Sequence, residues 1–302
     1  MRLKDGAHLT YSTAVHPGEI WSEIRAQLVS HAPAVKRLIS PDQPFGMGLR
    51  LSAAAARSLA EPRQFAEFQE FLEGHGLYVF TMSGGPYGSC HEPRIKDGVY
   101  LPDWQDERRL DFADRLAWLL SRLLPEDVAE GTITTIPGAF KGHVPSPGAI
   151  EDMADRMIRH VATLFRLYQE TGRCIVLAIE PEPCCLLETV EETISFFQNH
   201  LFAGASRLAG LLGISWPAAE IVLRRHLGLC LDACHVALQF EEPLPAVLRL
   251  RAAGIRIVKV QISAGLRLTR LTPAALAALG PFVHDMELHQ VVEQGTAGLW
   301  RH

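Results

Sequence analysis

Two residues with metal-ligand chemistry, Asp232 and His235, follow directly on the apolar run Leu229–Leu231. If that run is a strand, the carboxylate and the imidazole lie together at its carboxyl end. An oxygen ligand combined with a nitrogen ligand suits Mn²⁺, Mg²⁺, Co²⁺ or Zn²⁺. The spacing also fits a structural role, in which Asp232 caps a helix and His235 packs or hydrogen-bonds locally. The motif therefore predicts either a divalent-metal site or a capped helix.

A second carboxylate, Glu180, ends the strongly apolar run Ile175–Ile179. An ionised carboxylate beside a buried strand is costly unless a cation or a hydrogen-bond donor meets it. We therefore expect a partner for Glu180, which is either the same metal ion or an arginine. Glu182 follows two residues later, between two prolines, and is a candidate general acid or base.

The third chemical group stands at Val258–Ser263, where Gln261 ends another apolar run. Its side-chain carbonyl could bind a metal or a substrate. Lys259 lies two residues earlier and so points to the same side of a strand. A lysine inside a barrel would stabilise negative charge during catalysis, or would pair with Glu180 or Asp232.

These motifs give two predicted sets of residues. The predicted catalytic residues are Glu180, Glu182, His235 and Lys259, and the predicted metal ligands are Glu180, Asp232, His235 and Gln261. Polar residues at or after the earlier runs are weaker candidates for substrate binding, and each could equally be an ordinary loop residue. They are His16, Arg50, Tyr87, His91 and Lys141.

Short apolar runs alternate with longer amphipathic stretches along the chain, as in a parallel α/β fold. Polar residues end several of the runs, and the carboxyl ends of barrel strands are where active sites form. The predicted helices include Leu110–Leu124, Ile150–Thr171 and Pro245–Ala253, and two more are expected within 203–226. The predicted strands are His8–Thr13, Gly46–Leu51, Leu77–Met82, Thr132–Ile136, Cys174–Glu180, Gly228–Asp232 and Ile255–Gln261.

The predicted fold is α/β, a TIM (β/α)8-type barrel that lacks its last strand. An open doubly wound sheet is disfavoured because no GxGxxG motif follows the first run. Seven strands are one short of closure, and Phe282–Val292 is too polar to be a good eighth. We expect residues 1–302 to be a single domain truncated at its C-terminus, or a partner chain to close the edge.

Composition excludes several function classes. The net charge is -5 and no cluster of Lys and Arg suggests a nucleic-acid surface. We find neither a secretory signal nor an apolar stretch long enough to insert into a membrane. Six cysteines are scattered without disulfide-dense spacing, so we expect reduced thiols in a cytoplasmic protein.

Six segments together resemble EboE, a metabolite-traffic family within the xylose-isomerase-like (AP endonuclease 2-like) TIM-barrel superfamily. The resemblance implies a divalent metal held by a Glu, an Asp, a His and a final Glu, with isomerase or epimerase chemistry. It also implies traffic of a secondary-metabolite precursor, with a small-molecule metabolite and other Ebo-cluster proteins at the membrane as partners. Gln261 replaces the superfamily's usual His, which leaves both an enzyme and a non-catalytic carrier or scaffold open. The segments are 9–19, 44–52, 76–91, 100–112, 178–189 and 230–241.

Overall fold

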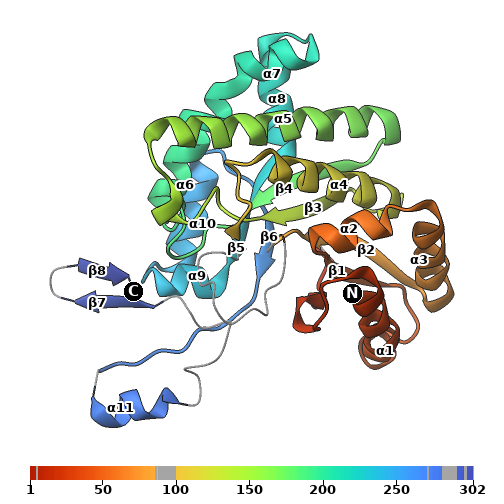
Figure 1. Cartoon of the computed structure of the whole chain (residues 1–302), viewed down its shortest axis with the longest axis horizontal. Helices are drawn as coiled ribbons and strands as arrows, with labels where there is room; N and C mark the ends of the chain where they lie inside the picture. The colour runs from red at the N-terminus through yellow and green to blue at the C-terminus, as the bar shows by residue number, and fades with distance from the viewer. Residues whose placement is uncertain are drawn as a thin grey trace.

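The structure is a computed structural model, and Figure 1 shows its course. It describes residues 1–4, 6–85, 87, 100–270, 272–280, 291–295 and 298–301. Among these residues, no helix combines the length and the apolar character that crossing a bilayer requires.

A six-stranded, all-parallel sheet forms the centre of the molecule, with its strands in sequence order from β1 to β6. Each strand coincides with one of the predicted runs, with ends that differ by a few residues. Near-continuous apolar character is expected where both faces of a parallel strand are covered. The strands are β1 (Phe45–Arg50), β2 (Leu77–Ser83), β3 (Glu130–Thr135), β4 (Cys174–Ile179), β5 (Leu227–Asp232) and β6 (Ile257–Gln261).

Helices connect the strands and lie around the outside of the sheet (Figure 1). The three named helix predictions are confirmed as α4, α5 and α10, and the two expected within 203–226 are α7 and α8. The helices are α1 (Trp21–Ile39), α2 (Ala53–Leu59), α3 (Pro62–His75), α4 (Glu107–Leu123), α5 (Pro147–Thr171), α6 (Val190–Phe196), α7 (Ala205–Leu212), α8 (Trp216–His226), α9 (Ala233–Leu238), α10 (Pro243–Ala252) and α11 (Pro273–Ala278).

The two faces of the sheet differ in chemistry. On the outer face, a side chain at Gly131 would meet Leu120 and Leu124 of the covering helices, so the odd-numbered residues of β3 face the apolar core. The even-numbered residues face the opposite, concave side. There the buried hydroxyl of Thr132 donates to the Thr81 hydroxyl at 2.7 Å.

The sheet is curled into part of a barrel. The Nζ of Lys259 on β6 donates to the hydroxyl of Thr134 on β3 at 2.7 Å. In a flat sheet these strands would lie about 14 Å apart, because neighbouring strands are about 4.8 Å apart. A lysine side chain cannot span that distance, so the contact requires strong curvature. The α/β half-barrel agrees with the predicted fold class.

The prediction of a strand at His8–Thr13 is wrong, because this segment contains only isolated bridges. It still runs beside β1, where the Thr10 hydroxyl donates to the carbonyl of Gly46 at 2.6 Å and the Thr13 hydroxyl accepts from the backbone of Arg50 at 2.8 Å. In a regular ladder, backbone groups of the neighbouring strand would bond to Gly46 and Arg50. Here the two threonine hydroxyls do so. This pairing covers the β1 edge without forming a strand.

The β6 edge is open among the described residues, since no strand pairs with it beyond β5. Val260 is 55% exposed and Ile262 is 85% exposed. The strands β7 (Val292–Gly295) and β8 (Gly298–Arg301) instead form a separate antiparallel hairpin, which Figure 1 shows apart from the main sheet. The weak strand candidate Phe282–Val292 lies almost wholly outside the described residues.

Candidate functional site

The strand register brings the predicted polar residues to one edge of the sheet. Asp232 is paired with Gln261 at the carboxyl ends of β5 and β6. Glu180 comes directly after β4, and its backbone N–H donates to the carbonyl of Thr135 at 3.1 Å. Register and alternation place Glu180, Asp232 and Gln261 on the same concave face as Thr134. We call Glu180, Asp232, His235, Lys259 and Gln261 the β4–β6 group.

Glu180 has neutral hydrogen-bond partners rather than an arginine. Its carboxylate accepts a hydrogen bond from the Gln261 amide, and the Nδ1 of His235 lies 3.8 Å away. Although 18% of the side chain is exposed, burial of the carboxylate raises its pKa to about 7. His235 and Lys259 act against this rise. The ion pair with an arginine that the sequence left open is therefore not formed among the described residues.

Asp232 is the N-cap of α9, as the structural alternative predicted. Its Oδ1 accepts from the backbone N–H of Cys234 at 2.8 Å, the backbone N–H of His235 at 3.2 Å and the hydroxyl of Ser263 at 2.5 Å. Burial raises the pKa of the carboxyl, but the charge of His235 and these hydrogen bonds outweigh it and lower the pKa overall. Asp232 is therefore a buried carboxylate that stays ionised.

The His235 ring is oriented by a backbone carbonyl, since its Nδ1 lies 2.9 Å from the carbonyl oxygen of Pro181. A carbonyl only accepts, so Nδ1 carries a hydrogen, and in the neutral ring Nε2 keeps a lone pair. Metal-binding histidines are commonly oriented in this way. The local hydrogen bond of the structural alternative is present, and it is compatible with metal binding.

A metal-ligand candidate that the sequence reasoning missed is Cys234. Among the described residues, Asp232, Cys234 and His235 each offer one donor atom within 4.8 Å of the other two. Burial raises the pKa of the Cys234 thiol to about 11. The signal was a cysteine next to a predicted ligand, within the motif Asp232–His235. Together these residues fit a divalent ion, because a carboxylate, a sulfur and an imidazole are brought close at one strand end.

A small cavity adjoins this group and is lined by Asp232 and His235 together with Glu188 and Glu241. The volume open to the centre of a water-sized sphere is about 20 Å³. One water needs roughly 10–15 Å³ by the same measure. The cavity can therefore hold a water molecule or an ion beside Asp232, but not a substrate.

Glu182 is positioned by a tyrosine that the sequence reasoning did not single out. The Tyr100 hydroxyl donates to Oε1 of Glu182 at 2.6 Å, and the Tyr100 ring stacks on Phe140. Burial, reinforced by the charge of Glu182, raises the pKa of Tyr100 far above its usual value. Glu182 thus lies near Glu180 with one oxygen held by a buried hydroxyl.

Lys141 lies between two carboxylates. Its Nζ is 3.2 Å from Glu188 and 2.8 Å from Glu192. Burial lowers the pKa of Lys141, but the two carboxylates outweigh it and raise the pKa overall. The lysine therefore joins the loop after β3 to the segment that begins α6.

His16 and Arg50 lie beside β1 and line a different cavity from the one at Asp232. Arg50 donates to the carbonyl of Gly18 at 3.1 Å and to Glu19 at 3.2 Å. The His16 ring stacks on His31 with centroids 4.5 Å apart. The structure therefore places these two substrate-binding candidates together, but apart from the metal-ligand group.

The remaining substrate-binding candidates follow β2. Tyr87 packs edge-on against Phe112, and the guanidinium of Arg109 lies 6.0 Å from its ring centre. His91 lies outside the described residues. The contacts of Tyr87 do not include Glu180 or Asp232.

Arg109 connects the chain segments on either side of this region. Its guanidinium donates to four backbone carbonyls and is 1% exposed. Burial lowers its pKa to about 10, so it remains charged at neutral pH. The acceptors are Pro102 at 2.8 Å, Gly84 and Gly85 at 2.9 Å, and Tyr100 at 3.4 Å.

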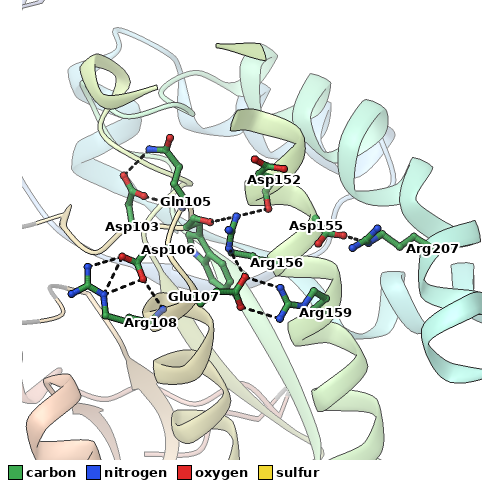
Figure 2. A network of polar contacts seen from close by, with 11 residues as sticks. Asp103, Gln105, Asp106, Glu107, Arg108, Asp152, Asp155, Arg156, Arg159 and Arg207 are labelled. Carbon is green, nitrogen blue, oxygen red and sulfur yellow. Dashed lines mark hydrogen bonds and ion pairs between the residues drawn. The ribbon is translucent and has the colours of Figure 1, made fainter. Parts of the chain in front are cut away.

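Figure 2 shows a second polar network, which joins the first turn of α4 to α5. Glu107 accepts from Arg159 at 2.8 and 2.9 Å and from Arg156 at 3.0 Å. Arg156 also donates to the carbonyl of Asp152 at 3.1 Å. Glu107 thus has two arginines as counter-charges, and these contacts join the two helices.

No protein-family model matches the sequence, and no curated protein is significantly similar to it. Among solved structures, the 3-keto-D-glucoside 4-epimerase YcjR of E. coli gives a TM-score of 0.41 at 16% identity, covering 89% of this chain and 96% of that one. A xylose isomerase-like TIM barrel protein from Mycobacterium smegmatis, in complex with magnesium, gives 0.45 at 16% identity, covering 82% and 67%. The IOLI protein with a binding zinc atom gives 0.40 at 10% identity, covering 75% and 66%. The function of this chain is therefore inferred from its own residues.

Proposed function

We propose that this chain is a metal-dependent enzyme of the isomerase or epimerase type that acts on a small, sugar-like metabolite. The observation that carries the proposal is the convergence of Glu180, Asp232 and His235 at one end of a polar, concave sheet face. Among the described residues, no lysine or arginine forms an ion pair with either carboxylate. A divalent cation would supply the missing positive charge.

In this proposal Asp232, His235 and Glu180 would hold the ion. Once bound, a divalent ion polarises a carbonyl or hydroxyl of the substrate. Glu182 moves a proton, and the hydrogen bond from Tyr100 keeps its carboxylate oriented. Lys259 places an ammonium on the same face, where it stabilises negative charge on a substrate oxygen.

A second candidate is a ligand-binding carrier without turnover. The specific observation in its favour is the hydrogen bond from Gln261, which occupies one oxygen of Glu180. This candidate fits the metabolite-traffic role implied by the resemblance to EboE, with other Ebo-cluster proteins at the membrane as partners. In that case the concave face would bind the metabolite and release it unchanged.

Solvent-exchange turnover tests the proposal. The chain is loaded with Mn²⁺, Co²⁺ or Zn²⁺ and incubated in D₂O with a panel of aldoses, ketoses and polyols, and deuterium incorporation is followed by NMR. Asp232→Ala is compared with Asp106→Ala, because Asp106 also caps a helix, but that helix is α4. Metal-dependent exchange lost only in Asp232→Ala supports the enzyme. Ligand binding without exchange favours the carrier, and the absence of any metal dependence contradicts the proposal.

A further inference from the structure

Cys234 lies within the proposed metal site. It occupies the first turn of α9, two residues after Asp232 and one before His235. The sulfur, a carboxylate oxygen of Asp232 and a ring nitrogen of His235 all lie within 4.8 Å of one another. Ligands on one tetrahedral zinc ion lie roughly 3.3–3.8 Å apart, given bond lengths of about 2.0–2.3 Å. Binding to one ion therefore requires each pair of donors to come within this range.

The existing hydrogen bonds leave donor atoms available. Two backbone N–H groups and the Ser263 hydroxyl donate to Oδ1 of Asp232, and the Cys234 thiol also hydrogen-bonds to this carboxylate. The hydrogen bond between His235 and Pro181 uses Nδ1. Lone pairs of the Asp232 carboxylate and, in the neutral ring, of Nε2 remain for a metal ion, while the capped helix and the Pro181 carbonyl hold both side chains in place. Such outer contacts are what orient ligands in known metal sites.

We propose that Cys234 supplies a thiolate ligand to the ion held by Asp232 and His235, so that the site selects Zn²⁺ or Co²⁺ over Mg²⁺ and Mn²⁺. The inference rests on the metal site of the proposed function. Sulfur ligands favour the softer ions, whereas Mg²⁺ and Mn²⁺ prefer sites made of oxygen. On binding, the metal–sulfur bond forms and the thiol proton leaves to solvent. Nothing is oxidised or reduced.

This ligand set differs from the one expected from the sequence. Gln261 was the predicted fourth ligand, and the N–H of its amide donates to Glu180. The sulfur of Cys234 lies within 4.8 Å of the donor atoms of Asp232 and His235. The replacement of an amide oxygen by a thiolate changes the class of metal that the site retains.

Cobalt absorption tests the inference directly. The metal-free chain is titrated with Co²⁺, and the near-ultraviolet region is followed for a thiolate-to-cobalt charge-transfer band. We expect a band that saturates at one Co²⁺ per chain and disappears in Cys234→Ser, with Co²⁺ affinity at least about 10-fold weaker. Mn²⁺ affinity should change much less. Cys174→Ser is the matched control, because Cys174 begins β4 at the opposite end of the strand.

Each outcome is decisive. Co²⁺ binding without the band, and with equal affinity in Cys234→Ser, would overturn the cysteine ligand and leave the proposed metal function intact. A band that persists in Cys234→Ser would assign the sulfur to another residue. If no metal binds to the unsubstituted chain, the proposed function itself fails. Circular dichroism of each variant confirms that the fold is retained.

Discussion

Glu107 and Glu180 are both acidic residues with close polar neighbours, but their surroundings shift their pKa values in opposite directions. Glu107 lies between Arg156 and Arg159, and the hydrogen bond from Arg159 is the main reason that its pKa is lowered. Glu180 accepts from the neutral amide of Gln261, and burial raises its pKa to about 7. The polar network between α4 and α5 thus contains its own counter-charges, whereas in the described part of the chain no arginine or lysine forms an ion pair with Glu180 or Asp232. The second region is therefore where a cation from outside would stabilise the protein.

The largest effect is expected at Arg109, a buried cation whose charge is met by four carbonyl groups. Arg109→Met would leave those carbonyls without donors in a buried site. We expect the free energy of unfolding to fall by roughly 3 kcal/mol or more. Urea denaturation of Arg109→Met and of the exposed control Arg108→Gln measures the difference. A loss at Arg109 no greater than that at Arg108 would show that the carbonyl contacts contribute little.

Glu180→Gln should stabilise the metal-free protein at pH 8. The folded-state pKa is about 7 against an ordinary value of 4.5, so ionisation is disfavoured by folding. Ionised Glu180 therefore lowers the free energy of unfolding, by an amount that grows as pH rises from about 4.5 to 7 and is constant at higher pH. One pKa unit corresponds to about 1.4 kcal/mol. Allowing for some solvent screening, we expect the free energy of unfolding of Glu180→Gln at pH 8 to be about 2 kcal/mol higher than that of the unsubstituted chain.

The same substitution should have little effect at pH 4, where Glu180 is protonated in both states. Thermal denaturation across this pH range checks the sign. A constant difference between the two proteins at every pH would mean that Glu180 is not held in an unfavourable charged state, and the contrast with Glu107 would disappear.

The smallest effect is expected at Glu107, whose side chain is 52% exposed. Glu107→Gln removes two arginine contacts, yet exposed ion pairs contribute no more than about 1 kcal/mol. The loss in the free energy of unfolding should shrink further in 1 M salt, where charges are screened within about 3 Å. A loss as large as that at Arg109 would show that the network in Figure 2 is a major stabilising element.

The strands and the carboxyl-edge residues could be predicted because both depend on local patterns. A buried parallel strand is an apolar run, and a charged residue at its end marks the edge. The order of the strands is then enough to predict that Glu180, Asp232 and Gln261 lie close together. The structural role of Asp232 as a helix cap was equally readable, because capping depends on the adjacent residues alone.

Other features could not be predicted because they depend on contacts between distant residues. The Thr10 and Thr13 hydroxyls bond to β1 beside a backbone hydrogen bond from Gly48 to Tyr11, a mixture that a strand pattern cannot reveal. Lys141 looked available, but it meets Glu188 and Glu192 about 50 residues further along. Cys234 was not predicted as a ligand, and its sulfur lies within 4.8 Å of donor atoms of Asp232 and His235.

The most direct test of this account is the stoichiometry and affinity of Zn²⁺ binding, measured by calorimetry and elemental analysis. Asp232→Ala and Asp106→Ala are compared, since each removes a helix-capping aspartate. The account predicts one ion per chain, with affinity reduced more than about 100-fold in Asp232→Ala and unchanged in Asp106→Ala. An unsubstituted chain that binds no ion, or that binds it as tightly after Asp232→Ala, would contradict the assignment of the β4–β6 group as a metal centre.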